Sequence, residues 1–331
     1  MAPLMAWRRM SGPDDPGLPP GEFEQIARLY RPLTRGAPEA LKLLDDVAVI
    51  PSRPGQDLIV TKDALVEGTH FHEGEARDLV ARKLLRTNLS DLAAKGAEPF
   101  GYFLAVAWPS GTGFGARQAF ARGLEIDGAA FDISLLGGDT VSTSGPLWAS
   151  LTLLGWAPHG RAILRSGARP GDLIMVSGPI GDGGLGLAAV EGRCPDPDGY
   201  LADRYRLPRP RLDLREDLRR SASACADVSD GLIADAGHIA KASGVALRLD
   251  LDRLPVSSPA EAWLSGQADR AMALSHLASF GDDYELVVTA PPAAAAALGL
   301  PVVGRVEAGE GITVAYEGAP MATGSGGWTH P

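Results

Sequence analysis

The sequence predicts a mixed α/β fold made of two domains. Apolar runs of strand length alternate with segments of helical periodicity, which is typical of sheets covered by helices. The chain has 331 residues, 45% of them hydrophobic, which is enough for two cores. A stretch rich in Pro and Gly at residues 157–171 separates two such series. We therefore expect an N-terminal domain over residues 21–157 and a C-terminal α/β domain over residues 158–331.

The elements of the N-terminal domain follow from helical spacing and apolar runs. Residues 1–20 are rich in Pro, Gly and Asp without any period, so we expect a disordered arm. Phe23, Ile26 and Tyr30 repeat at helical spacing, which predicts a short helix before Pro32. Further along, strands are expected at 41–44, 57–61, 100–108, 134–136 and 147–156, and helices at 76–94 and 116–130.

The helix predicted over residues 76–94 is the clearest element of the chain. Leu85, Leu89 and Leu92 form one apolar stripe, and Gly96 follows where a helix stop is expected. Asn88 and Asp91 lie one turn apart, off that stripe. The helix therefore has an apolar face and a separate polar face.

In the C-terminal domain, apolar runs again alternate with helical segments. We expect one helix after Gly183 and another at 232–242, the second ended by Gly244. Strands are expected at 173–176, 226–228, 245–249, 284–289 and 302–306.

Charge and composition exclude several classes of protein. The formal charge is −10, from 31 basic and 41 acidic residues, so we expect no binding to nucleic acid. No run of 18 apolar residues occurs, and no apolar segment follows Arg8 and Arg9. We therefore expect no membrane span and no secretory signal, and predict a cytoplasmic protein. Cys194 and Cys225 lack zinc-ligand spacing and are expected to be incidental thiols.

Acidic residues recur where apolar strands are expected to end. They are Asp45 and Asp46, Asp63, Asp139, Asp227 and Asp230, and Asp282 and Asp283. Any one of them taken alone is better explained as a turn former or a helix cap. Together they indicate a cation site, because converging carboxylates repel one another. Hard oxygen ligands without nearby Cys or His favour magnesium, and magnesium in turn points to a phosphate substrate.

The common phosphate-binding motifs find little support. A Walker loop needs a Gly-Lys pair, and the chain has none. Residues 181–186 match G-x-G-x-x-G, but the acidic strand end expected about 20 residues later is absent, so a tight strand-to-helix turn is the better interpretation. The turns Gly137-Gly138-Asp139 and Ser229-Asp230-Gly231 remain candidates for binding phosphate through backbone N–H groups. Asp230 alone is better explained as a helix N-cap, and Arg165 is either a guanidinium for a polyphosphate or a surface residue.

Several longer segments together carry a family resemblance. They are GEFEQIARLY, LLDDVAVI, DALVEGTHF, TNLSDLAAKGAEP, SLLGGDT, DVSDGLIADAGHIAKASGV and FGDDYEL. Taken in order, over roughly residues 21 to 331, they resemble the thiamine-monophosphate kinases. That family lies within the superfamily of aminoimidazole ribonucleotide synthetase and selenophosphate synthetase. NLSDLAAKGA, GGDT and SDGL recur across the superfamily, whereas GEFE and VEGTHF are typical of the kinases.

The resemblance implies an ATP- and magnesium-dependent transfer of the γ-phosphoryl group onto thiamine monophosphate, which gives thiamine diphosphate and ADP. It also implies a two-domain aminoimidazole ribonucleotide synthetase-like fold whose N-terminal domains pair through a barrel-like sheet, so a homodimer is expected. No protein nucleophile is expected, because the acceptor phosphate is itself nucleophilic at neutral pH.

The resemblance further assigns residues to ligands. Several Mg²⁺ ions would be bound by Asp46, Thr61, Asp63, Asp91, Asp139, Asp227 and Asp230. ATP, as co-substrate, would contact Gly138, Asp139, Arg165 and Ser229. Thiamine monophosphate would contact His70, Asp282 and Trp328. The alternatives are that His70 is a half-buried residue at a strand end and that Trp328 packs the C-terminus.

The chain departs from the family pattern at Leu44, Lys62, Ala64 and Phe280. Lys62 is the most consequential, because it is adjacent to Asp63. Its ammonium either replaces a magnesium contact or, by strand alternation, lies on the opposite side.

Two other functions stay open at this point. The first is another ATP-dependent synthetase, of the selenophosphate or aminoimidazole ribonucleotide type, and the second is a catalytically silent nucleotide-binding dimer. A selenophosphate synthetase needs a reactive Cys or its equivalent near the N-terminus, whereas the first Cys here is Cys194.

Overall fold

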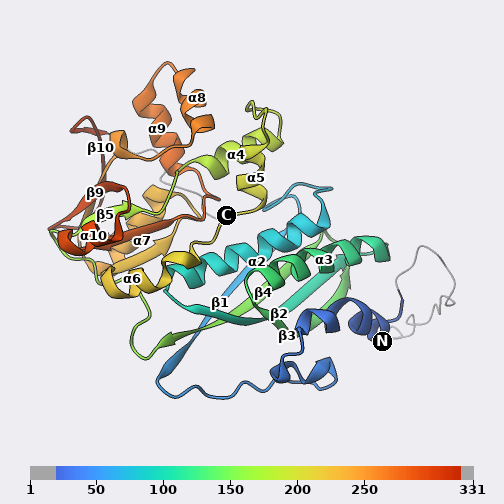
Figure 1. Cartoon of the computed structure of the whole chain (residues 1–331). Helices are drawn as coiled ribbons and strands as arrows, with labels where there is room; N and C mark the ends of the chain where they lie inside the picture. The colour runs from blue at the N-terminus through green and yellow to red at the C-terminus, as the bar shows by residue number, and fades with distance from the viewer. Residues whose placement is uncertain (1–19, 322–331) are drawn as a thin grey trace, which may run out of the picture.

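Two β-sheets with helices packed against them make up the fold (Figure 1). The computed structural model describes residues 20–321. Both sheets contain parallel and antiparallel pairs, which confirms the mixed α/β class. Trp328 and all of the predicted disordered arm except Pro20 lie outside the described residues.

The first sheet has four strands in the order β1-β4-β2-β3. β2 and β3 run parallel, and β4 is antiparallel to both β1 and β2. Helices α2 and α3 lie side by side on one face (Figure 1), where Tyr102, Leu104 and Trp108 of β2 join the core. The elements are β1 (Gln56–Val66), α2 (Arg77–Ala94), β2 (Glu98–Pro109), α3 (Phe114–Ala130), β3 (Ser134–Thr143) and β4 (Trp148–Pro158).

The opposite face of this sheet is open. Leu58, Val60 and Val141 are 42%, 56% and 50% exposed. Within residues 20–321 the sheet does not close, because β1 and β3 remain separate edges. The expected barrel-like sheet is therefore not found in the single chain, and four strands are too few for closure, which takes about eight.

The second sheet has seven strands in the order β11-β10-β7-β9-β5-β8-β6. Its strands are β5 (Leu173–Val176), β6 (Ala224–Asp227), β7 (Ala246–Asp250), β8 (Leu286–Ala290), β9 (Val302–Glu307), β10 (Gly311–Tyr316) and β11 (Ala319–Met321). The accompanying helices are α4 (Asp182–Val190), α5 (Tyr200–Arg206), α6 (Arg215–Ser221), α7 (Leu232–Ser243), α8 (Ser258–Ser265), α9 (Arg270–Ser279) and α10 (Pro292–Leu298). The last strand of the first sheet ends at Pro158 and the second sheet begins at Leu173; the boundary at residue 158 stays a prediction.

The N-terminal segment corrects one expectation. The predicted first helix exists as α1 (Glu22–Gln25), followed by a π-helical turn at Ile26–Tyr30 and a 3₁₀ turn at Arg31–Thr34. The strand predicted over 41–44 is wrong, because most of that run lies in a second 3₁₀ segment, Pro38–Leu43. Leu41, Lys42 and Leu43 have φ values of 47°, 60° and 52°. Three left-handed residues in succession cannot form a strand, and an apolar run of four residues does not by itself specify one.

Helix α2 has the features that the sequence predicts. Leu85, Leu89 and Leu92 are fully buried. Gly96 ends the helix with φ +65°, and the N–H of Ala97 donates to the carbonyl of Leu92 at 2.9 Å.

The same helix also contacts the second half of the chain. Lys95 Nζ donates to the carbonyl of Cys225 at 2.9 Å, and Arg86 Nη1 donates to the carbonyl of Pro208 at 3.1 Å. Helix α2 therefore connects the two sheets. No helix within residues 20–321 is long and apolar enough to cross a bilayer.

Candidate active site

Carboxylates from both halves of the chain approach one another beside helix α2. They are Asp63 on β1, Asp91 on α2 and Asp227 at the end of β6. The charge of Asp91 acts on both Asp63 and Asp227, and the charge of Asp63 acts on Asp227. Thr61 Oγ1 donates a hydrogen bond to Asp91 Oδ2. We refer to Thr61, Asp63, Asp91 and Asp227 as the acidic cluster.

The local structure explains why these side chains face one another. Thr61 and Asp63 are two residues apart on a strand, so both point to the face that α2 covers. Asn88 fixes the strand to the helix, because its Oδ1 accepts the N–H of Asp63 at 3.1 Å while its Nδ2 donates to the carbonyl of Leu84 at 2.8 Å. Asn88 is fully buried and lies one turn before Asp91. The polar face of the predicted helix is thus the face that carries the site.

Burial and mutual repulsion make these carboxylates costly to ionise. Burial raises the pKa of Asp63 to about 7, with a further contribution from the charge of Asp91. Burial also raises the pKa of Asp91, although the hydrogen bond from Thr61 and the charges of Lys95 and Arg165 act in the opposite direction. The pKa of Asp227 is raised well above its usual value by burial and by Asp91. Positive charge from Lys95 and Arg165 therefore compensates the acidic cluster only in part.

The donor set of the acidic cluster fits Mg²⁺. It consists of three carboxylates and a hydroxyl, which are the hard oxygen ligands that Mg²⁺ prefers. Within residues 20–321, no Lys or Arg forms an ion pair with Asp63, Asp91 or Asp227. A divalent cation would supply the charge that the cluster lacks.

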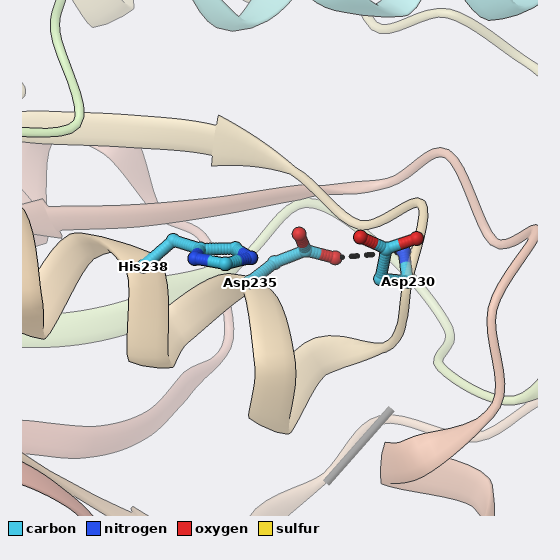
Figure 2. A group of neighbouring side chains, drawn as sticks. All are labelled: Asp230, Asp235 and His238. Carbon is cyan, nitrogen blue, oxygen red and sulfur yellow. Dashed lines mark hydrogen bonds between the residues drawn. The ribbon is translucent and has the colours of Figure 1, made fainter. Parts of the chain in front are cut away.

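A second group of possible ligands lies at the start of α7. The side chains of Asp230, Asp235 and His238 offer ligand atoms that all lie within 4.8 Å of one another (Figure 2). Asp235 Oδ2 accepts the backbone N–H groups of Ser229 and Asp230, each at 3.0 Å. Burial, followed by the charge of Asp230, raises the pKa of Asp235 to about 7.

This arrangement corrects two interpretations of the Ser229-Asp230-Gly231 turn. Gly231, rather than Asp230, occupies the N-cap position, and no side chain caps the helix there. The N–H groups of Ser229 and Asp230 are bound by Asp235 and so are satisfied within the protein. Asp235 and His238 were not predicted from the sequence, although their spacing of one turn on a predicted helix is a signal that could have indicated them.

Arg165 is exposed and close to both acidic groups. Its charge lowers the pKa of Asp91 and of Asp235, in each case against the larger effect of burial. Arg165 therefore lies near the acidic cluster and near the turn that contains Ser229. The structure brings together Thr61, Asp63, Asp91, Arg165, Asp227, Ser229 and Asp230 from the residues predicted for metal and nucleotide.

Asp46, Gly138 and Asp139 lie elsewhere. They line a cavity of about 340 Å³ between the N-terminal helical segments and β3. Asp139 pairs with Ala105 of β2, on the face of the sheet opposite the buried Leu104. Asp63 and Asp139 thus belong to opposite edge strands and point to opposite faces. Gly138 is required by packing, because a Cβ there would lie 2.0 Å from the carbonyl oxygen of Leu104.

The residues predicted for thiamine monophosphate meet at a third place. Asp282 Oδ2 lies 3.5 Å from Lys83 Nζ, and the same ammonium donates to the carbonyl of His70 at 3.3 Å. His70 Nδ1 accepts the N–H of Val66 at 3.1 Å, so the side chain is half-buried beside the end of β1. Burial raises the pKa of Tyr284, and the charges of Asp282, Asp63 and Asp227 raise it further. Because all three charges act on it, Tyr284 lies between Asp282 and the acidic cluster.

Lys62 lies on the opposite side of β1 from Asp63. Its Nζ donates to Ser150 Oγ at 2.9 Å on the open face of the sheet. Of the two interpretations of this departure, the structure supports the one in which strand alternation separates the two side chains.

Two family models match most of the chain. The N-terminal domain of AIR synthase related proteins matches residues 44–157, and the C-terminal domain matches residues 169–317. The two-sheet fold with its acidic cluster is thus that of an AIR synthase related protein.

Individual relatives show which family of AIR synthase related proteins the chain resembles. A thiamine-monophosphate kinase of Caulobacter vibrioides is 60% identical over 321 residues, which cover 94% of this chain and 91% of the relative. A crystal structure of thiamine-monophosphate kinase from Stenotrophomonas maltophilia K279a is 36% identical with a TM-score of 0.77, and the match covers 91% of this chain and 98% of that one. The structure of AaThiL complexed with AMPPCP and TMP is 28% identical with a TM-score of 0.76, covering 85% and 89%. The chain belongs to the thiamine-monophosphate kinase family.

Proposed function

We propose that this protein transfers the γ-phosphoryl group of ATP directly, in line, onto the phosphate of thiamine monophosphate, forming thiamine diphosphate and ADP. The relatives named for this activity and the neighbour complexed with AMPPCP and TMP support the proposal. The observation that carries it is the acidic cluster, where Asp63, Asp91 and Asp227 come from both halves of the chain and have raised pKa values.

Phosphoryl transfer requires the protein to position the two substrates and to neutralise the negative charge of their phosphates. The acceptor phosphate is already nucleophilic at neutral pH, so no side chain need attack or remove a proton from it. The acidic cluster would hold Mg²⁺, which when bound neutralises charge on the phosphates and on the transferring group. Asp230, with Asp235 and His238 beside it, would bind a further cation.

Arg165 and the Ser229 side chain would contact the nucleotide. Arg165 is exposed, and its guanidinium can pair with two phosphate oxygens at once. Asp282 and His70 would orient the acceptor, together with Trp328. The backbone N–H of Asp282 donates to the carbonyl of Ser229 at 2.9 Å, so the residues proposed for the acceptor adjoin the turn proposed for the nucleotide.

We further propose that two copies of the chain pair through the open face of the four-stranded sheet. Leu58, Val60 and Val141 form an exposed apolar surface there, and α2 and α3 cover only the other face. Such pairing would cover Asp139 and the cavity beside it, which the single chain leaves open. Sedimentation of the wild type and of Val60→Asp tests this: a dimer that becomes monomeric in the variant supports it, and a wild-type monomer contradicts it.

The alternative synthetase of the selenophosphate type has less support. Cys194 and Cys225 are both buried, and burial raises the pKa of Cys225 to about 12, so neither offers an accessible thiolate. The silent-dimer alternative would be favoured by the loss of several acidic ligands, and the predicted acids are all present in the chain.

One experiment separates these functions. The purified protein is incubated with ATP labelled at the γ-phosphate, MgCl₂ and thiamine monophosphate, and the products are resolved. Label in thiamine diphosphate is the expected result, and no transfer beyond a protein-free control contradicts the proposal. EDTA should stop transfer, and Mg²⁺ should restore it better than Ca²⁺, because Mg²⁺ holds strict octahedral geometry.

A further inference from the structure

Lys83 is a buried lysine on the polar side of α2. The residue is only 2% exposed. Lysine is seldom buried unless its charge is paired, because transfer of an ammonium out of water is costly. Burial lowers the pKa of Lys83, and the charge of Asp282 acts in the opposite direction. The fold therefore keeps a costly cation at this position.

The Lys83 ammonium contacts three residues that come from different parts of the chain. Its Nζ lies 3.5 Å from Asp282 Oδ2, donates to the carbonyl of His70 at 3.3 Å, and lies 3.6 Å from the centroid of the Tyr205 ring. Tyr205 also donates its hydroxyl to the carbonyl of His70, at 3.2 Å. Lys83 thus joins a residue after β1 to a loop before β8, and these are the two described residues proposed to bind the acceptor.

The backbones of both partners of Lys83 are held by further hydrogen bonds. The N–H of His70 donates to the carbonyl of Val66 at 2.9 Å. Asp282 has a left-handed backbone with φ +65°, and its N–H donates to the carbonyl of Ser229 at 2.9 Å. The Asp282 side chain is contacted by Tyr284 and by the Lys83 ammonium, and the ammonium is the contact that also bonds the His70 backbone.

The loop that carries Asp282 is anchored from its other side by the glycine-rich turn at 181–186. The carboxylate of Asp283 accepts the N–H of Gly181 at 2.7 Å and the N–H of Gly183 at 2.9 Å. A Cβ at Gly183 would lie 2.3 Å from the carbonyl carbon of Asp282. With the loop backbone fixed in this way, the direction of the Asp282 carboxylate depends on its contacts with Lys83 and Tyr284, and Lys83 supplies the charged one.

We propose that Lys83 is a positioning residue for the acceptor phosphate ester, and that it sets the separation of Asp282 and His70 without contacting the substrate. This inference rests on the proposed function. Loss of the ammonium releases the Asp282 side chain and weakens binding of thiamine monophosphate, whereas the nucleotide residues near Arg165 are unaffected.

The test compares Lys83→Met with Arg82→Met. Methionine keeps most of the side-chain volume and removes the charge. Arg82 is adjacent on α2 and pairs with the buried Asp127 at 3.0 Å, so its substitution also removes an ion pair, but one away from Asp282. KM for thiamine monophosphate, KM for ATP, kcat and the thermal unfolding midpoint are measured for both variants and the wild type.

The expected result is a rise of about tenfold or more in KM for thiamine monophosphate in Lys83→Met, with KM for ATP changed less than about twofold. Arg82→Met should lower the unfolding midpoint and leave the ratio of the two KM values unchanged. A Lys83→Met enzyme whose two KM values are unchanged, or rise together, overturns the inference. If Lys83→Met does not fold, Lys83→Gln carries the same test, because it also removes the ammonium beside Asp282 while keeping a polar group in the buried position. A wild type without any transfer to thiamine monophosphate would instead refute the proposed function.

Discussion

Buried or half-buried carboxylates occur in two regions of the molecule, and the protein compensates their charge differently in each region. Glu285, at the end of the loop that carries Asp282, is 3% exposed and lies in a cage of donors. Arg204 Nη2 is 3.0 Å from its Oε1, Arg211 Nη1 is 2.8 Å from its Oε2, and Ser177 Oγ donates to Oε2 at 2.5 Å. In the acidic cluster, Asp63, Asp91 and Asp227 instead face one another and have raised pKa values.

This difference distinguishes a structural carboxylate from a ligand. An ion pair that is complete within the protein contributes to folding, and removing one partner leaves the other charge buried. A group of carboxylates without cations is a cost to the fold, so its presence needs another explanation, and binding of Mg²⁺ provides one. The predictions below test this contrast.

The largest effect is expected for Asp91→Asn. Asp91 is the member of the acidic cluster whose charge acts on both of the others, so its loss should remove a metal contact and reduce kcat on the order of 1000-fold or more. The folded state should be retained, because asparagine keeps the shape of the side chain and removes a charge that repels Asp63 and Asp227. Turnover and the urea unfolding curve together check this, and a variant with near-normal turnover would refute the metal assignment.

Glu285→Gln, in contrast to Asp91→Asn, should mainly lower the stability of the folded protein. The buried guanidinium of Arg204 and the half-buried one of Arg211 would lose the charge of Glu285, and the free energy of unfolding should fall by about 3 kcal/mol. Urea unfolding of the variant measures this. An unfolding free energy equal to that of the wild type would mean that the cage is not structural.

The pH dependence of stability provides a third test. The folded pKa of Asp63, about 7, lies above its unfolded value, so the folded state binds the proton more tightly. The metal-free protein should therefore lose stability as pH rises from about 4 to about 7. Asp63→Asn removes this contribution.

The measurement is the unfolding midpoint in EDTA at pH 5 and pH 8. The gain in midpoint from Asp63→Asn should be larger at pH 8 than at pH 5, and Mg²⁺ should abolish the gain at pH 8. A gain of the same size at both pH values would show that the carboxylate of Asp63 is not strained in the folded protein.

The smallest effect is expected for Lys62→Thr. Lys62 binds Ser150 on the open face and is exposed, so its charge should not substitute for a cation beside Asp63. A titration of turnover against Mg²⁺ should give midpoints within about twofold for wild type and variant. A clear increase in the Mg²⁺ concentration required by the variant would show that the Lys62 ammonium does substitute for a cation beside Asp63.

The sequence contained enough information for the elements and for part of the site. The helical period of α2 predicted its buried stripe, strand alternation allowed for Lys62 and Asp63 on opposite sides, and the family resemblance assigned Thr61, Asp63 and Asp91 to the metal. The strand at 41–44 was wrong because backbone strain at Leu41 to Leu43 leaves no signal in an apolar run. Lys83 was missed for a different reason: its partner Asp282 is distant in sequence, and only the fold brings them together.

The sequence predicted only in part which acidic residues lie close together in the folded chain. A list of acids at strand ends does not say which face or which edge of a sheet each one occupies. Asp139 follows the same pattern as Asp63, yet the strand order and register place the two on opposite edges and faces. Strand order is a property of the whole fold, and local spacing does not specify it.

Helix α2 carries both Lys83, at the acceptor end, and Asp91, in the acidic cluster. Eight residues separate them, which corresponds to about 12 Å along the axis and a rotation of about 80°. The helix therefore sets the distance between Lys83 and the acidic cluster. Its backbone hydrogen bonds fix that distance, which does not depend on the conformation of a loop. Insertion of one residue between these positions would turn one end away from the other by about 100°, so changes of length in this segment should be far less tolerable than changes of side chain.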